Sequence, residues 1–220
     1  MAAELLLALA TGVLGLLVGV LVDRAAARFP WSEPPLNRRS ALRSAVVAGT
    51  TAGLFVLVGL RFGASWELPA FLAVSAAGML LALIDLRHHL LPDRVVLPSL
   101  GIGVVLLGVA ALGEGSWPSL GRALLAGAAL FGVFLVLALI SPASLGMGDV
   151  KLAALVGLYL GWLGWDAVVL GAAAGFVVQA VLALALLAAR RIGLKGELPF
   201  GPAMLIGAGI AIGWSGALLA

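Results

Sequence analysis

Eight apolar segments, each close to the length that crosses a bilayer, recur along this chain of 220 residues. A helix needs about 20 mainly apolar residues to cross the hydrocarbon core, so the recurrence predicts an all-α polytopic membrane protein. The composition agrees, since 63% of the residues are hydrophobic and only 10% are charged. We expect about eight transmembrane helices in one membrane-embedded domain, residues 1–220. The segments cover 3–22, 43–60, 68–86, 95–113, 119–140, 150–164, 167–189 and 201–219, of which the sixth is short.

Several function classes are excluded at this stage. The chain has no cysteine, which rules out disulfides and cysteine-ligated metal sites. Its net charge of +3 includes no basic run with interleaved aromatic residues, so nucleic-acid binding is not indicated. The first apolar segment carries Glu4 instead of a basic leader, which predicts a retained span and not a cleaved signal peptide. The small residues of GAAAG at 171–175 predict close helix packing.

The basic residues predict an orientation in the membrane. If the eight segments alternate in direction, every one of the 13 basic residues except Arg61 and Arg122 falls on one side. The positive-inside rule makes that side cytoplasmic. The longest polar segment, 23–44, lies on this side, and its prolines predict an irregular cytoplasmic loop.

Two carboxylates lie on the same predicted side, each at the end of an apolar segment. Asp85 closes the third segment, and Asp149 opens the sixth. Carboxylates at the edge of the apolar layer are partly desolvated yet still meet water. If they face one another they can share a proton, so that one acts as a base toward water and the other as an acid.

The residues around Asp149 leave two interpretations open. Gly146 and Gly148 permit the close backbone approach that an extended peptide substrate needs. Alternatively, the segment is a plain loop in which Asp149 is the N-cap of a helix. Asp93, which follows Pro92, has the pattern of a turn or an N-cap.

Other polar residues near these acids have ordinary interpretations. Lys151 either pairs with a nearby carboxylate or extends its ammonium to the lipid headgroups, and the second is slightly favoured. His88 and His89 are adjacent, so both cannot easily bind one metal ion, and solvated loop histidines are expected. No metal site is predicted.

Four motifs, taken in order along the chain, resemble one known family. IDLRHHLLPD at 84–93 and GMGDVKL at 146–152 are similar to segments of the type IV prepilin peptidases, which are GxGD aspartic proteases of the membrane edge. GLLVGVLVDRAAARFP at 15–30 resembles the family's first span, and PFGP at 199–202 resembles its terminal motif. The resemblance covers nearly the whole chain.

The resemblance implies a fold, an activity and a site. It implies the GxGD aspartyl protease fold, with Asp85 and Asp149 as the catalytic aspartates. The implied substrate is the short basic cytoplasmic leader of a type IV prepilin or pseudopilin, cleaved after a glycine just before the apolar helix. The implied place is the bacterial cytoplasmic membrane, with the site facing the cytoplasm. We predict that the substrate approaches along Gly146, Gly148, Lys151, Asp93, Pro199, Phe200, Gly201 and Pro202.

One departure from the family concerns cofactors. Many members carry a cytoplasmic domain with two CxxC pairs and methylate the new pilin N-terminus with S-adenosylmethionine. Here the segment 23–44 is short and has no cysteine, and Asp23 stands where the family usually has Asn. We therefore predict a peptidase without cofactor, with methylation absent or done without a metal site.

Two other classes of function stay open on residues alone. A proton-coupled transporter relays protons through acids near the middle of the bilayer, whereas these acids lie at segment ends. A non-catalytic assembly protein of a secretion system would tolerate loss of either carboxylate. The pilin substrate and the oligomeric state are not specified by the sequence.

Overall fold

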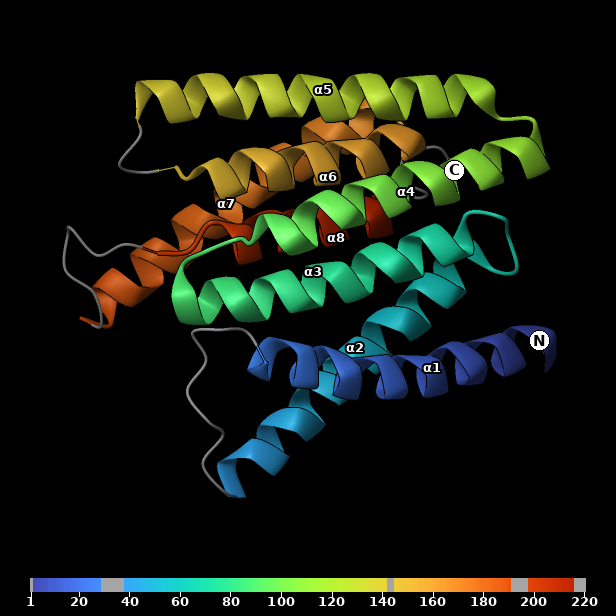
Figure 1. The fold of residues 1–220 in the computed structure, drawn as a ribbon, viewed down its shortest axis with the longest axis horizontal. Coiled ribbons are helices and arrows are strands. Elements are labelled where there is room, and N and C mark those ends of the chain that lie inside the picture. Colours follow the sequence, from blue (N-terminus) through green and yellow to red (C-terminus); the bar gives the residue numbers. More distant parts are fainter. Residues whose placement is uncertain (1, 29–37, 142–144, 191–197, 216–220) are drawn as a thin grey trace. The chain divides into compact units, whose positions relative to one another are not determined.

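The computed structural model describes residues 2–28, 38–141, 145–190 and 198–215, and within these ranges it is all helical (Figure 1). The predicted eight helices are confirmed, with ends within a few residues of the apolar segments except between α1 and α2 and at the end of α8. They are α1 (Ala2–Ala27), α2 (Arg38–Phe62), α3 (Leu68–His88), α4 (Asp93–Glu114), α5 (Trp117–Ile140), α6 (Met147–Leu163), α7 (Trp165–Ala188) and α8 (Gly201–Trp214).

Six of these helices are long and apolar enough to cross a membrane, namely α1 to α5 and α7, as counted over the described residues. The other two are shorter, α6 with 17 residues and α8 with 14. At about 1.5 Å per residue, α6 is roughly 25 Å long, against about 30 Å for the hydrocarbon core. The protein is thus a multi-pass membrane protein in which α6 is a short helix.

The predicted irregular loop over 23–44 was wrong at both ends. α1 continues to Ala27 and α2 already begins at Arg38, so only the middle of this segment, 29–37, lies outside the described residues. One contact between the two helices, from Arg43 to Asp23, accounts for their greater length. Nε of Arg43 lies 2.9 Å from Oδ1 of Asp23, and this ion pair holds the polar ends of the two helices together.

The chain divides into two compact units, 1–83 and 84–220. The division does not decide the prediction of a single domain, because α3 runs unbroken across the boundary. In the first unit, α1 and α2 pack through small residues: a Cβ on Gly19 would lie 2.6 Å from Cα of Ala48. Such contacts allow two backbones to approach closely in a membrane.

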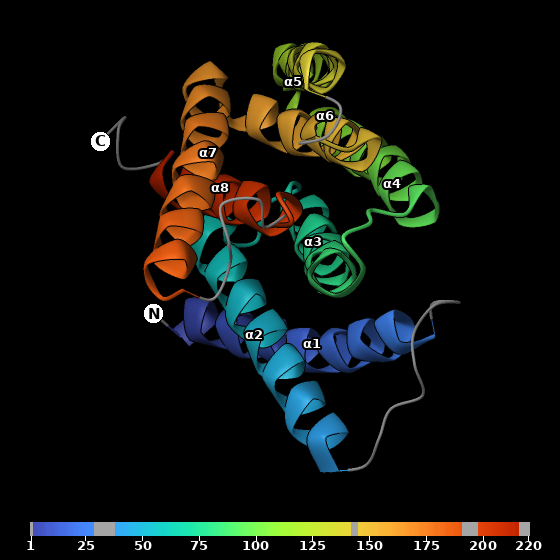
Figure 2. The ribbon, with the colours of Figure 1, turned by 90° about the vertical axis from the view of Figure 1, so that its left-hand side faces the viewer.

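The second unit is built around α6, which contacts α4, α5, α7 and α8 (Figure 2). α6 is apolar on all sides after Lys151, as expected of a helix buried by its neighbours. Gly157 and Gly161 of α6 pack against Ala126 of α5, leaving no space for a side chain. The packing predicted for GAAAG is confirmed, since Gly171 and Gly175 of α7 lie against Gly207 of α8. Close packing through small residues thus holds α6 against α5, and α7 against α8.

Candidate active site

Asp85 lies in the last turn of α3 and is almost fully buried, with 4% of its surface exposed. Its Oδ2 accepts a hydrogen bond of 3.1 Å from the backbone N–H of Gly201, the first residue of α8. The first N–H groups of a helix have no partner within the helix and carry a partial positive charge. The start of α8 therefore supplies Asp85 with the kind of donor that suits a carboxylate.

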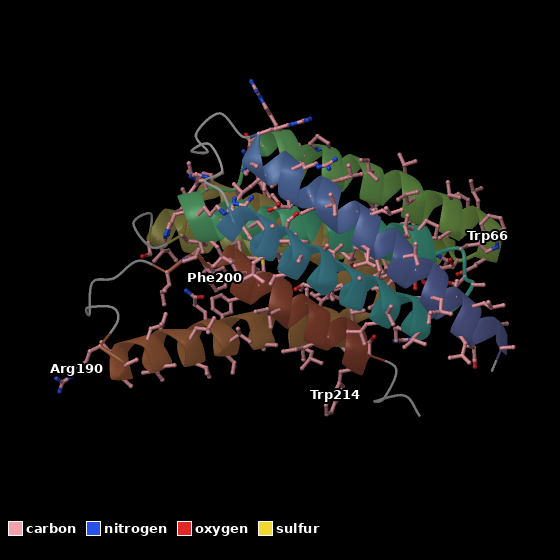
Figure 3. All side chains as sticks on the ribbon, turned by 90° about the horizontal axis from the view of Figure 1, so that it is seen from below. Trp66, Arg190, Phe200 and Trp214 are labelled. Carbon is pink, nitrogen blue, oxygen red and sulfur yellow. The ribbon has the colours of Figure 1, made fainter. Side chains whose placement is uncertain are left out.

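The PFGP segment holds the start of α8 in this position. The ring of Phe200 lies 5.9 Å from the ring of Phe134 on α5 and 5.2 Å from that of Phe176 on α7. Figure 3 shows Phe200 at the opposite end of α8 from Trp214. Pro202 stands at the second position of the helix, where a missing N–H costs no internal hydrogen bond. Aromatic contacts thus anchor the segment that delivers the N–H of Gly201.

Gly201 leaves no space for a side chain. A Cβ at this position would lie 2.6 Å from Oδ2 of Asp85 and 3.5 Å from Cδ2 of Leu152 on α6. The backbone at the start of α8 is therefore inserted between the end of α3 and the first turns of α6. Glycine is required here by close approach, because any side chain would displace the carboxylate.

Asp149 lies in the first turn of α6, ahead of the apolar part of that helix. Its Oδ2 accepts a hydrogen bond of 3.1 Å from the backbone N–H of Gly146, which is the N-cap residue. Asp149 is thus the third residue of the helix and not the N-cap, but its carboxylate does cap the helix by reaching back. The N-cap interpretation was therefore wrong, because Gly146 is the N-cap and the carboxylate of Asp149 binds the N–H of this preceding residue.

The protonation of Asp149 is set mainly by its surroundings. Burial is the main effect and raises the pKa of Asp149, the hydrogen bond from Gly146 lowers this pKa, and the nearby charge of Asp85 raises it; together these effects bring the pKa to about 6. A carboxyl group with a pKa near 6 can hold or release a proton near neutral pH, as acid–base catalysis requires.

Lys151 and Asp93 form an ion pair, which corrects two expectations. Nζ of Lys151 lies 2.6 Å from Oδ1 and 2.7 Å from Oδ2 of Asp93. The slight preference for an ammonium extended to the headgroups was wrong, and the alternative of pairing holds. Asp93 is the first residue of α4 and Pro92 is its N-cap, so Asp93 is not the N-cap either. Its carboxylate binds Lys151 across the two helices.

The two glycines of GMGD have different surroundings. A Cβ on Gly148 would lie 2.8 Å from Cβ of Leu91, so the space beside Gly148 is taken by the segment between α3 and α4. A Cβ on Gly146 would lie 3.6 Å from Oδ2 of Asp149, an ordinary contact, and Gly146 is exposed. Room beside the backbone therefore exists at Gly146 and not at Gly148.

The histidines occupy the end of α3. His88 is the last residue of the helix, and His89 has a left-handed backbone with φ of 52° that ends it. The backbone N–H of His89 donates to the carbonyl oxygen of Asp85 at 2.8 Å. Among the described residues, no group of three or more His, Asp or Glu side chains is placed to hold a metal ion.

The structure brings together residues from three motif segments that are far apart in sequence, namely 84–93, 146–152 and 199–202. Asp85 and Gly201 make direct contact, as do Asp93 and Lys151, and Asp149 shares its helix with Lys151. Three participants were missed from sequence, namely Leu91, Phe134 and Phe176. Leu91 lies inside the LLPD motif, which is a usable signal. The two phenylalanines lie in long apolar runs where nothing distinguishes them.

The fold and the site define a class: a helical multi-pass membrane protein with one carboxylate at the end of a helix and a second at the start of another. Residues 71–189 match the model of the type IV leader peptidase family. The chain belongs to this family.

Individual relatives agree with this assignment. The chain is 32% identical to the prepilin leader peptidase/N-methyltransferase of Pseudomonas aeruginosa, over 84% of this chain and 67% of that protein. It is also 32% identical to the enzyme of that name from Stutzerimonas stutzeri, over 71% of this chain, but spans only about half, 53%, of that protein. It is 34% identical to leader peptidase HopD of Escherichia coli, over 69% of this chain and 96% of HopD. No solved structure matches the chain.

Proposed function

We propose that this protein is a membrane aspartic endopeptidase that removes the leader peptide from type IV prepilins or pseudopilins. The observation that carries the proposal is the pair Asp85 and Asp149: each carboxylate accepts a hydrogen bond from a backbone N–H at a helix start. The charge of Asp85 also raises the pKa of Asp149. Membership of the type IV leader peptidase family supports the same activity. So do the printed names of the Pseudomonas aeruginosa and Escherichia coli relatives.

The proposed reaction needs one proton shared by two carboxyl groups. The ionised carboxylate takes a proton from a water molecule, whose oxygen attacks the carbonyl carbon of the scissile peptide bond. The protonated carboxyl group gives its proton to the carbonyl oxygen. In the resulting tetrahedral intermediate the C–N bond then breaks, and the proton held by the first carboxylate passes to the leaving nitrogen. As the C=O bond re-forms, one hydroxyl group of the intermediate returns its proton to the second carboxylate. Atoms and charges balance without a metal ion or another cofactor.

The proposed substrate is a chain with a short basic leader followed by an apolar helix. Such a substrate would place its scissile bond at the membrane edge. Asp85, in the last turn of α3, and Asp149, in the first turn of α6, are proposed to lie there. Gly146, beside Asp149, is exposed, which leaves space on this side of the site for an extended peptide. The lipid bilayer is the second partner that the proposal requires.

The test is leader removal in cells that co-express a prepilin. We expect Asp85→Asn and Asp149→Asn each to abolish cleavage, seen as a mobility shift of the pilin. Asp166→Asn is the matched control, because Asp166 is an exposed carboxylate in the first turn of α7. Continued cleavage in either active-site variant would reject the two-aspartate mechanism. Unimpaired pilus or secretion assembly in both would favour the non-catalytic alternative, and proton-driven uptake would favour a transporter.

We further propose that the site faces the cytoplasm of the bacterial inner membrane. The supporting observation is the distribution of basic residues, which leaves only Arg61 and Arg122 on the opposite side in the eight-span topology. The chain has no cysteine, so single cysteines report the two ends of α3 cleanly. We expect a membrane-impermeant maleimide to label Leu90→Cys only from the cytoplasmic side, and Trp66→Cys only from the other. The reverse pattern would overturn the orientation.

We also infer that cleavage is not followed by N-methylation in this chain. The inference rests on the absence of cysteine, which excludes the two CxxC pairs of the methylating members. S-adenosylmethionine would then be neither bound nor needed. Mass spectrometry of the mature pilin, processed with and without S-adenosylmethionine, tests this inference. We expect identical masses, whereas a gain of one methyl group would contradict it.

A further inference from the structure

Four residues, 89–92, connect α3 to α4 and lie across the start of α6. The left-handed backbone of His89 ends α3 one turn after Asp85, and the extended backbone of Pro92 begins α4. Both ends of this connection are therefore conformationally fixed. Any movement of the connection relative to α6 would move Asp85 relative to Asp149.

Two contacts hold this connection on α6. Leu91 packs on Gly148 so closely that no Cβ fits between them. Two positions after Leu91, both carboxylate oxygens of Asp93 bind Nζ of Lys151, at 2.6 and 2.7 Å. Gly148 and Lys151 lie on either side of Asp149 in the first turn of α6. We call Leu91, Gly148, Asp93 and Lys151 the α4–α6 clamp.

The ion pair of the clamp contributes little to stability. The side chain of Asp93 is 57% exposed and that of Lys151 is 25% exposed. Ion pairs this accessible to water typically add about 0–1 kcal/mol, because water screens them and both side chains lose freedom. The ion pair therefore matters mainly for the positions of the residues that it joins. It joins the first residue of α4, which follows Asp85 by eight positions, to the residue two positions after Asp149.

We propose that the α4–α6 clamp fixes the spacing of Asp85 and Asp149, with Asp93 and Lys151 as positioning residues. The ion pair and the Leu91–Gly148 contact flank Asp149 and tie its helix turn to the connection that leaves Asp85. Misplacement of reacting groups by about 1 Å can cost on the order of a hundredfold in rate. The inference rests on the proposed peptidase function only for its effect on rate, not for its effect on spacing.

The spacing is tested directly with spin labels. Leu86 follows Asp85 directly and Met147 precedes Asp149 by two positions, and these side chains are 58% and 52% exposed. Since the chain has no cysteine, Leu86→Cys/Met147→Cys accepts labels at these two positions alone. In detergent, we expect Lys151→Met to broaden the distance distribution or shift it by several ångströms. Lys151→Arg, which keeps the charge, is expected to preserve it.

Further variants separate the clamp from general effects of charge. Asp93→Asn is expected to change the distribution as Lys151→Met does, and the exchange Asp93→Lys/Lys151→Asp to restore most of it. Arg94→Met removes a neighbouring exposed charge outside the clamp and is the matched control. A distribution in Lys151→Met identical to that of the parent would overturn the proposal. Thermal unfolding confirms that each variant is folded.

Cleavage kinetics give the second measurement. For a prepilin in detergent, we expect Lys151→Met to lower kcat by about tenfold or more while KM changes by less than about threefold. Lys151→Arg should recover most of kcat. If the parent does not cleave prepilin, the proposed function fails, but the distances between the spin labels still test whether the clamp fixes the spacing of Asp85 and Asp149. If kcat of Lys151→Met equals that of the parent, the clamp is rejected as a positioning device.

Discussion

The backbone N–H of Gly201 donates a hydrogen bond of 3.1 Å to Oδ2 of Asp85, across 116 positions of sequence. This bond links the PFGP segment to the end of α3 and explains why the motif has a glycine at the position where α8 begins. A donor from the backbone has no rotamers to order, so it holds the carboxylate without a flexible partner. The relationship makes Gly201 the most constrained glycine of the site.

We predict that Gly201→Ala abolishes most activity without unfolding the protein. The added Cβ would lie 2.6 Å from Oδ2 of Asp85, so the carboxylate has to move and its hydrogen bond is lost. The expected loss in kcat is about a hundredfold. Gly209→Ala, in the same helix with nothing within 4 Å of the added Cβ, is the control. Equal activities of the two variants would contradict the role given to Gly201.

A second prediction distinguishes the two glycines of GMGD. Gly148→Ala forces its Cβ against Leu91 at 2.8 Å, so we expect at least a tenfold loss in kcat. Gly146→Ala makes only an ordinary contact at 3.6 Å, and its backbone, with φ of −81°, suits any residue. We therefore expect Gly146→Ala to lose much less kcat than Gly148→Ala. Leader cleavage at matched expression measures both, and a greater loss for Gly146→Ala would be evidence against this distinction.

The helices were largely predictable because a membrane imposes a simple condition on sequence. A run such as 119–140 must be apolar and long enough to cross, whatever its neighbours are, and α5 was found at Trp117–Ile140. The same condition failed for 23–44, where helices continue past the apolar layer. There the prolines of a polar segment suggested a loop, whereas the ion pair of Asp23 with Arg43 joins the polar ends of two longer helices.

The site was predictable as a set of residues but not as a set of contacts. Asp85, Asp149 and the PFGP segment were identified from sequence motifs, which give residue types and their order along the chain but not their contacts. The pairing of Lys151 with Asp93 spans 58 positions and depends on how α4 packs on α6. The contact of Gly148 with Leu91 has the same origin. Since glycine permits both open space and close packing, sequence alone could not distinguish them.

The raised pKa of Asp149 predicts how stability depends on pH. Because its pKa is about 6 in the folded protein and 3.8 in the reference state, the folded protein binds this proton more tightly. Its contribution is fully present below about pH 4 and is lost as pH rises through 6. Asp149→Asn removes the cost of the buried charge, so we expect it to be more stable than the parent at pH 7.5, by on the order of 1–3 kcal/mol.

Thermal unfolding in detergent between pH 4 and pH 8 measures this effect. We expect the difference in Tm between Asp149→Asn and the parent to be largest above pH 6 and to shrink toward pH 4. Asp166→Asn, at an exposed position in the first turn of α7, should show no such trend. A constant difference across the pH range would mean that Asp149 is not the titrating group.

The last prediction concerns the ion pair between Asp23 and Arg43. Asp23 is 6% exposed, while a third of the Arg43 side chain meets solvent. Removing the arginine leaves a buried carboxylate without its counter-charge, which costs more than the pair itself contributes. With allowance for the exposure of Arg43, we expect Arg43→Met to lower the free energy of unfolding by about 1–3 kcal/mol.

Asp23→Asn/Arg43→Met should recover part of this loss, because the neutral amide no longer needs a counter-charge. Asp23→Asn alone introduces the asparagine that the family usually has at this position. We expect this variant to lose less free energy of unfolding than Arg43→Met. Tm values of the three variants in detergent form a double-mutant cycle that isolates the coupling. Additive losses would show that the two side chains do not stabilise each other, despite their separation of 2.9 Å.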